Sequence, residues 1–361
     1  MKDLEGNTIK VLETMNQHYL VLGKPGAGKT YWSMKNMEKS VEAGNRITVL
    51  DFSGSYNEEE ISKSRPSLFE KIHFVGAKDS DGINWKNNYQ SDPLFCDDVT
   101  DSIIKILDIK SYFQEKLLRE AVKMQLIGFP NFSFPMLVFT LEIMLGLVEE
   151  KKIVTESMKK MVAIIKSKER TEDDMKNIER LLARLAPYEH IYNFGIKKEV
   201  KEEEKLITVI QLNEMALQKK KFLTSFILEM LWNELKFDQE KRHCDVLVLD
   251  EFQFLTFSEN AALTNLLREA RRFGLKIILI SQFVSNYSRA EISALMQVGQ
   301  KLFFRPAESE LEFTASLVAT NRKKEWVDLL DGLSRGEAVF KGTYTLNDSA
   351  STDCTPIICK I

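Results

Sequence analysis

The sequence Gly23-Lys24-Pro25-Gly26-Ala27-Gly28-Lys29-Thr30 has the pattern G-x-x-x-x-G-K-[ST] of a phosphate-binding loop. The apolar run of residues 19–22 before it predicts a buried strand, and residues 29–44 predict a helix. In this setting the glycines let backbone N–H groups close around phosphate oxygens, at which the positive end of the helix dipole points. Lys29 then reaches the β- and γ-phosphates, and Thr30 gives its hydroxyl to Mg²⁺. The expected nucleotide-binding residues are Gly23, Lys24, Pro25, Gly26, Ala27, Gly28, Lys29, Thr30 and Tyr31.

Two consecutive acids, Asp250 and Glu251, follow a second apolar run at residues 246–249. A carboxylate at the end of such a strand can hold Mg²⁺ through water, which we expect of Asp250. Glu251 would stand beside the γ-phosphate and polarise the attacking water as a general base. Taken alone, the pair could simply be surface acids that end a strand. The phosphate-binding loop in the same chain favours the catalytic interpretation.

A third apolar strand, residues 277–280, leads to Gln282, and three arginines precede it. Since a polar side chain at the end of a buried strand does not serve the core, Gln282 is expected to touch the γ-phosphate or the catalytic water. Arg271 and Arg272 end a helix, where they could simply complement its dipole. The functional alternative is an arginine finger that reaches the nucleotide of a neighbouring subunit. Arg271 is the first candidate, and Arg272 or Arg268 is the next.

The order of elements predicts an α/β fold with a mainly parallel sheet and an inserted helical subdomain. Residues 1–16 form a short N-terminal extension, and strands alternate with helices in residues 17–83. Residues 84–200 have helical periodicity, with a capping-box pattern at Thr171 and Asp174, and we expect them to form the insertion. The alternation returns in residues 201–361, which complete the core and end in a C-terminal tail.

The composition is that of a globular protein without a strong charge. The 361 residues include 50 Lys and Arg and 53 Asp and Glu, a net charge of −3, which excludes a basic coat for nucleic acid. DNA binding would therefore need a local patch or the inner surface of an assembly. The four cysteines are too scattered for a disulfide framework. No apolar signal-peptide core starts the chain, and polar residues, Gly and Pro interrupt its most apolar stretch, so we expect a cytoplasmic protein without a membrane span.

Together these motifs resemble those of the HerA/FtsK branch of RecA-like motor ATPases, and the HerA side fits better. Three differences stand out: Lys24-Pro25-Gly26-Ala27 lies where T-G-S-G is common, Ser55 replaces an acid, and about 16 residues precede the first strand, too few for the family's N-terminal barrel. Further segments are similar to the family's D-P-x-G-E-Y turn (residues 51–56), the entry to its helical insertion (Gly82-Ile83-Asn84), the strand before its second long helix (207–212) and its L-x-x-G-E motif (332–338).

The resemblance implies a RecA-like P-loop ATPase core with ATP and Mg²⁺ as cofactors. It also implies a homo-oligomeric ring, usually a hexamer, that hydrolyses ATP between subunits and handles DNA through its central channel. Relatives of this kind act with a nuclease or an anti-phage effector, so a protein partner is expected here too.

Two functions stay open at this point: a DNA translocase of the helicase type, or an ATPase ring that serves as scaffold and regulator of an effector enzyme. Basic loops facing the pore would favour the first. The basic clusters Lys219-Lys220-Lys221 and Lys166-Ser167-Lys168-Glu169-Arg170 are better explained as solvated helix surface.

Overall fold

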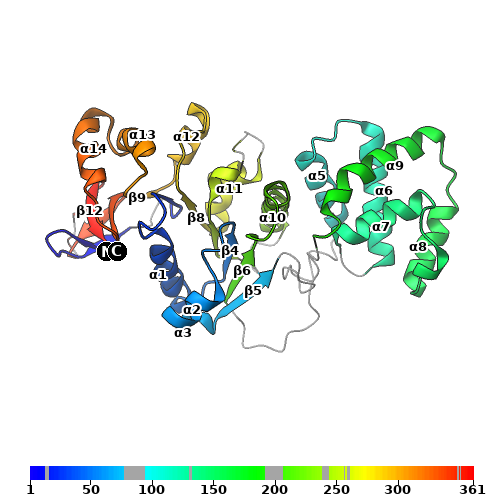
Figure 1. Ribbon diagram of the computed structural model, residues 1–361, viewed down its shortest axis with the longest axis horizontal. Coiled ribbons are helices and arrows are strands. Elements are labelled where there is room, and N and C mark those ends of the chain that lie inside the picture. The colour runs from blue at the N-terminus through cyan, green and yellow to red at the C-terminus, as the bar shows by residue number, and fades with distance from the viewer. Residues whose placement is uncertain are drawn as a thin grey trace. The chain divides into compact units, whose positions relative to one another are not determined.

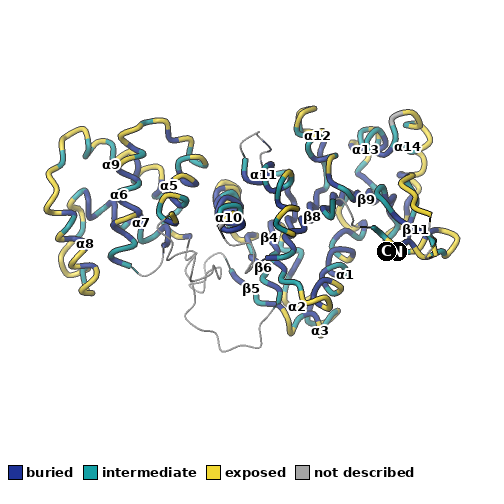
Figure 2. Tube along the Cα trace, turned by 180° about the vertical axis from the view of Figure 1, so that it is seen from behind, coloured by how far each residue is buried: buried dark blue, intermediate teal, exposed yellow. Residues whose placement is uncertain are grey.

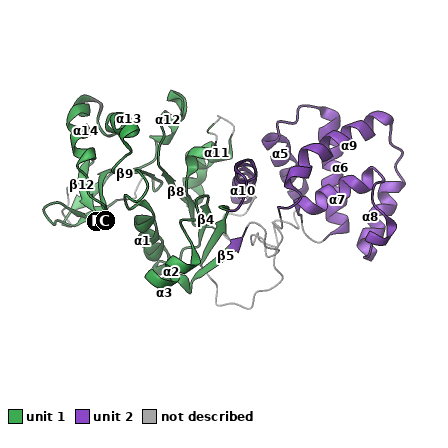
Figure 3. Cartoon of the chain, viewed as in Figure 1, with its two compact units in different colours: residues 1–74, 204–213, 244–361 green, residues 75–203, 214–243 purple. Residues whose placement is uncertain are grey.

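The computed structural model describes residues 1–12, 16–76, 94–129, 132–191, 206–237, 244–255, 257, 261–347, 349 and 351–361. The chain divides into two compact units, coloured in Figure 3. Unit 1 comprises Met1–Phe74, Glu204–Asn213 and Cys244–Ile361, and unit 2 comprises Val75–Glu203 and Glu214–His243. The boundaries predicted at 83/84 and 200/201, like Gly82-Ile83-Asn84, lie outside the described residues.

The core of unit 1 is built on a ten-stranded sheet, which has β5 (Ile72–Gly76) at one edge. Its central strands run parallel in the order β9-β3-β8-β7-β4-β6. Strand β10 (Glu337–Lys341) is antiparallel to β9, and β12 (Ile357–Lys360) and β1 (Lys2–Asp3) continue that edge. The α/β fold class with a mainly parallel sheet is confirmed. The parallel strands are β3 (Tyr19–Leu22), β4 (Ile47–Asp51), β6 (Ile207–Gln211), β7 (Val246–Leu249), β8 (Lys276–Ser281) and β9 (Gln300–Phe304).

Strands β3, β7 and β8 are buried at every residue, which explains why residues 19–22, 246–249 and 277–280 are continuous apolar runs rather than alternating ones (Figure 2). Helices α1 (Lys29–Glu42) and α11 (Ala262–Glu269) lie on opposite sides of these strands (Figure 1). Trp32, Met37 and Val41 of α1 share a core cluster with Val21 of β3 and Val248 of β7. Unit 1 also contains the α-helices α2 (Glu58–Ser64), α3 (Pro66–Phe69), α12 (Arg289–Leu295), α13 (Leu311–Val318) and α14 (Lys323–Asp331), and the small sheet of β2 (Ile9–Val11) and β11 (Tyr344–Leu346).

The described part of unit 2 is mainly helical, and Val75 and Gly76 at its start end strand β5. Phe134 is fully buried and packs against Phe132, Phe222 and Phe226, so an aromatic cluster joins the start of α7 to α10. The expected capping box of Thr171 and Asp174 is present. The last helix, α10, belongs to unit 2, although its residues were expected in the second part of the ATPase core. The helices are α5 (Phe95–Ile106), α6 (Tyr112–Gly128), α7 (Phe134–Met144), α8 (Glu156–Lys166), α9 (Glu172–Leu185) and α10 (Leu217–Phe237).

Within the described ranges, none of the helices combines the length and apolar character needed to cross a bilayer.

Candidate nucleotide site

The phosphate-binding loop connects β3 to α1 at the carboxyl edge of the sheet, as predicted. Gly28 caps α1 with a φ of +118°, a conformation that a side chain would strain. At Gly23, a Cβ would come within 2.6 Å of the Phe304 Cβ on the adjacent strand β9. The glycines are therefore required by the backbone path and by close packing, and they leave the loop's N–H groups able to face a phosphate.

Lys29 is almost buried at the first turn of α1, with 8% of its surface exposed. Its Nζ donates hydrogen bonds to the carbonyl oxygens of Gly23 (2.6 Å) and Lys24 (3.0 Å). Burial lowers the pKa of Lys29, while the nearby carboxylates of Glu251 and Asp250 act in the opposite direction. The loop thus holds the ammonium group of Lys29 close to Glu251, the predicted general base, and to Asp250, the predicted metal ligand.

The two acids follow β7 directly, and both are buried. Asp250 accepts a 2.5 Å hydrogen bond from the Ser53 hydroxyl. Burial raises the pKa of Asp250 to about 7, helped by the negative charges of Glu251 and Asp51 and opposed by Ser53 and Lys29. The surroundings of Asp250 thus do not fully stabilise its negative charge, and a bound cation would do so.

The turn after β4 brings Ser53 to Asp250. Asp51 is fully buried and accepts backbone hydrogen bonds from Gly54 (2.9 Å), Ser55 (3.1 Å) and Tyr56 (3.0 Å). Burial raises the pKa of Asp51, and these backbone bonds act against that rise. Both carboxylate oxygens of Asp51 thus accept backbone N–H groups, so Asp51 shapes the turn. Sequence reasoning missed Ser53, because its contact depends on how β4 and β7 pair.

Glu251 lies at the centre of a network of amides and a hydroxyl. Its φ of +55° lies in the left-handed region, uncommon for a residue other than glycine. Gln282 donates to one carboxylate oxygen (Nε2 to Oε1, 2.5 Å), and Gln253 donates to the other. Ser281 in turn donates to Gln253 (Oγ to Oε1, 2.6 Å). Because β8 lies between β3 and β7, the predicted pair Glu251 and Gln282 is brought together beside the loop.

Gln253 is the second residue that sequence reasoning missed. It lies in the short helix η3 (Phe252–Phe254), between two aromatic residues. A single polar residue between two aromatics, two positions after the acid, is the only signal that could have indicated it.

The donors near Asp250 suit Mg²⁺. Thr30 offers a hydroxyl and Asp250 a carboxylate, both hard oxygen donors. In the part of the chain that the structure describes, no three His, Cys, Asp or Glu side chains gather to hold a metal by themselves.

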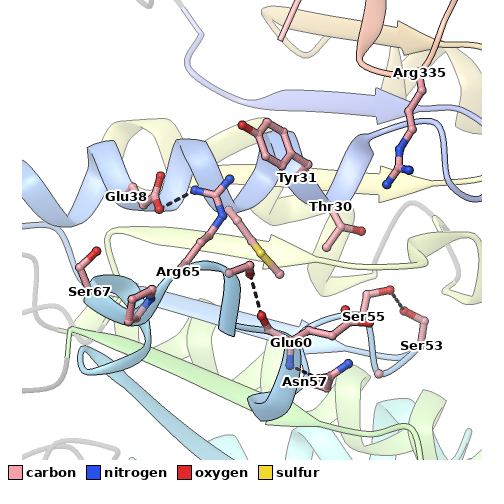
Figure 4. A pocket seen from close by; sticks show the side chains of 14 residues that line it. Thr30, Tyr31, Glu38, Ser53, Ser55, Asn57, Glu60, Arg65, Ser67 and Arg335 are labelled. Atoms are coloured by element: carbon pink, nitrogen blue, oxygen red, sulfur yellow. Dashed lines mark hydrogen bonds and ion pairs between the residues drawn. The ribbon is translucent and has the colours of Figure 1, made fainter. Parts of the chain in front are cut away.

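A pocket of about 820 Å³ opens beside the N-terminus of α1 (Figure 4). Thr30 and Tyr31 line it from α1, Ser53 and Ser55 from the turn after β4, and Arg335 from the loop before β10. Tyr31 is 55% exposed, and the Arg65 guanidinium lies 4.8 Å from the centre of its ring. The pocket thus contains Thr30 and Tyr31 of the predicted site, and Ser53 connects it to Asp250, which does not itself line it.

The three candidate finger arginines lie at the other edge of the sheet. Arg271 and Arg272 belong to the turn η4 (Ala270–Phe273), which precedes β8, whereas Gln282 follows that strand. Six strand residues at ~3.3 Å each separate these ends by roughly 20 Å. Arg271 lies near His18, and Arg272 pairs with Glu269 at 3.7 Å. The arginines before β8 are therefore remote from the phosphate-binding loop of their own chain.

Several solved structures share this architecture. VirB4 of Thermoanaerobacter pseudethanolicus has a TM-score of 0.63 and 19% identity, covering 100% of this chain and 94% of VirB4. The chain has the RecA-like P-loop ATPase fold. The plasmid coupling protein TrwB, solved with the non-hydrolysable ATP analogue ADPNP, has a TM-score of 0.61 and 14% identity, with 95% of this chain and 85% of TrwB covered. No family model and no curated protein matches the sequence. The predicted resemblance is thus confirmed at the level of the fold.

Proposed function

We propose that this chain is a HerA-like ATP hydrolase that works as a ring, with a hexamer favoured, and acts on DNA. The observation that carries the proposal is the position of Glu251. Both oxygens of its carboxylate accept amide hydrogen bonds, and it lies close to the ammonium group of Lys29. A nucleotide on the loop would place its γ-phosphate between these two residues.

The residues divide the chemistry between them. Lys29 and the loop N–H groups bind the phosphates, and Glu251 accepts the proton of the attacking water, with Gln282 orienting it. Thr30 and Asp250 would hold Mg²⁺, which neutralises charge on the phosphates when it is bound. Arg271 would come from a neighbouring subunit, because its own loop lies at the far edge of the sheet. TrwB, which shares the fold, was solved with an ATP analogue and with a GTP analogue, and this supports a nucleoside triphosphate such as ATP as the ligand.

Hydrolysis and assembly are tested first. Purified protein should hydrolyse ATP with Mg²⁺, and Lys29→Ala should bind no ATP because the phosphates lose their cation. Mass photometry at the assay concentration should show multiples of 41.6 kDa, six being favoured. A fully active monomer would overturn the subunit-interface site, and a wild type that neither binds nor hydrolyses ATP would overturn the proposal itself.

The scaffold function remains the alternative, and one observation favours it. In the basic cluster at residues 166–170, Lys168 and Arg170 both pair with Glu120, and Lys166 pairs with Glu150. Their charges are therefore partly neutralised within unit 2 and are poorly suited to follow a DNA backbone. Duplex or single-stranded DNA should stimulate hydrolysis, less so at high salt, if the ring is a translocase. An unchanged rate with DNA would favour a ring that regulates a nuclease or anti-phage effector.

A further inference from the structure

The loop before β10 is fixed to the phosphate-binding loop of the same chain. Gly336 N–H donates to the Ala27 carbonyl oxygen (3.0 Å), and a Cβ on Gly28 would lie 3.4 Å from the Gly336 Cα. From the other side, Ile361 N–H donates to the Gly336 carbonyl oxygen (3.0 Å). The residue before Gly336 is therefore held beside the nucleotide site of its own subunit.

That residue is Arg335, whose side chain is exposed and lines the pocket. Figure 4 shows its guanidinium group extending from the loop toward the side of the pocket where Thr30 lies. Across the described ranges, no hydrogen bond or ion pair joins Arg335 to another residue. The other arginine of the pocket, Arg65, is instead neutralised by Glu38 at 2.5 Å. Arg335 is thus the pocket's available guanidinium, and guanidinium groups bind phosphate oxygens in a bidentate manner.

The sheet order indicates which phosphates it can reach. The start of β10 lies at the same edge as the ends of β3 and β7, because β10 is antiparallel to its neighbour β9. In the order β10-β9-β3-β8-β7, the loop strand β3 lies midway, two strands from each. At ~4.8 Å per strand, Arg335 and Glu251 start from backbone positions roughly 20 Å apart. Glu251 would lie beside the γ-phosphate of a bound nucleotide. Arg335 would therefore approach the phosphate chain from the end opposite the γ-phosphate.

We propose that Arg335 binds the α- and β-phosphates of a nucleotide held by its own subunit, a contact that ATP and ADP share. The proposal rests on the proposed function, because it needs a nucleotide on the loop. The site then has two arginines with different roles: Arg335 binds the nucleotide of its own subunit, and Arg271 promotes hydrolysis in a neighbouring subunit.

Measured affinities for ADP and ATP distinguish these two roles. Fluorescent ADP is titrated into wild type and Arg335→Ala, and fluorescent ATP into the same pair carrying Glu251→Gln to prevent turnover. Loss of a charge-assisted contact should lower the affinity for both nucleotides by about 10- to 100-fold. Arg335→Lys, which keeps the charge but not the fork, should recover part of the loss. The matched control is Arg322→Ala, an exposed arginine of unit 1 outside the pocket, which should bind normally.

Each result has one meaning. Unchanged ADP affinity in Arg335→Ala overturns the assignment, and so does a loss confined to ATP, which would place the arginine on the γ-phosphate. A wild type that binds neither nucleotide overturns the proposed function itself. An Arg335→Ala protein that melts as the wild type does but binds weakly supports the proposal.

Discussion

His18, just before β3, should make the stability of unit 1 depend on pH. Its side chain is fully buried, and its Nδ1 accepts the backbone N–H of Ile277 (3.1 Å). Protonation of Nδ1 would break this bond and add a charge beside Arg271 and Lys276. Burial, together with the positive charges of Arg271 and Lys276, lowers the pKa of His18 from 6.5 to about 4.

The direction and size of this pH effect on folding stability follow from the difference in pKa between the folded and unfolded chain. Between pH 6.5 and pH 4 the unfolded chain takes up a proton at His18 and the folded chain does not, so folding stability falls as the pH falls through this window. At 1.36 kcal/mol per pKa unit, the loss is about 2 kcal/mol at pH 5 and approaches about 3 kcal/mol near pH 4.

Urea unfolding at pH 7.5 and pH 5, followed by tryptophan fluorescence, measures this effect. His18→Asn retains an acceptor but does not titrate, so wild type should lose about 2 kcal/mol more than this variant over that range. His190→Gln, at an exposed histidine of unit 2, is the matched control and should behave as wild type. Equal pH dependence of wild type and His18→Asn would refute the reasoning.

Three further predictions concern the nucleotide site. Gln282→Ala should bind ATP normally and hydrolyse it about 10- to 100-fold more slowly, because Glu251 loses an orienting amide; normal turnover in a rapid-quench assay would contradict this role. Ser53→Ala should raise the Mg²⁺ concentration needed for half-maximal hydrolysis, because Asp250 loses its hydrogen-bond donor; an unchanged Mg²⁺ titration would show that the turn plays no part. Arg271→Ala should bind ATP but hydrolyse it up to ~10³-fold more slowly, and mixing it with Lys29→Ala should restore activity at mixed interfaces; mixed rings without activity would assign the finger to Arg272 or Arg268.

Much of unit 1 could be predicted because its signals are local. The loop at residues 23–30 and the apolar runs that became β3, β7 and β8 each depend on neighbouring residues only. Gln282 could be predicted as well, because a polar residue after a buried parallel strand must lie at the ligand-binding edge.

The contacts that join strands distant in sequence could not be predicted. Ser53 meets Asp250 only because β4 pairs with β7, and Gln253 meets Ser281 only through the fold of a short helix. Arg335 was overlooked for the same reason, since its place beside Ala27 depends on the antiparallel return of β10. The assignment of α10 to unit 2 likewise depends on packing, which helical periodicity does not reveal.

The central claim is that Glu251 is the general base of an ATP hydrolase, and one single-turnover measurement tests it most directly. Radiolabelled ATP is mixed with excess wild type or Glu251→Gln, and bound nucleotide and released phosphate are followed together. The variant should bind ATP as tightly as wild type, because Lys29 and the loop are unchanged, and should release almost no phosphate, because an amide cannot accept the proton of the water. Phosphate release by Glu251→Gln at the wild-type rate would contradict the account.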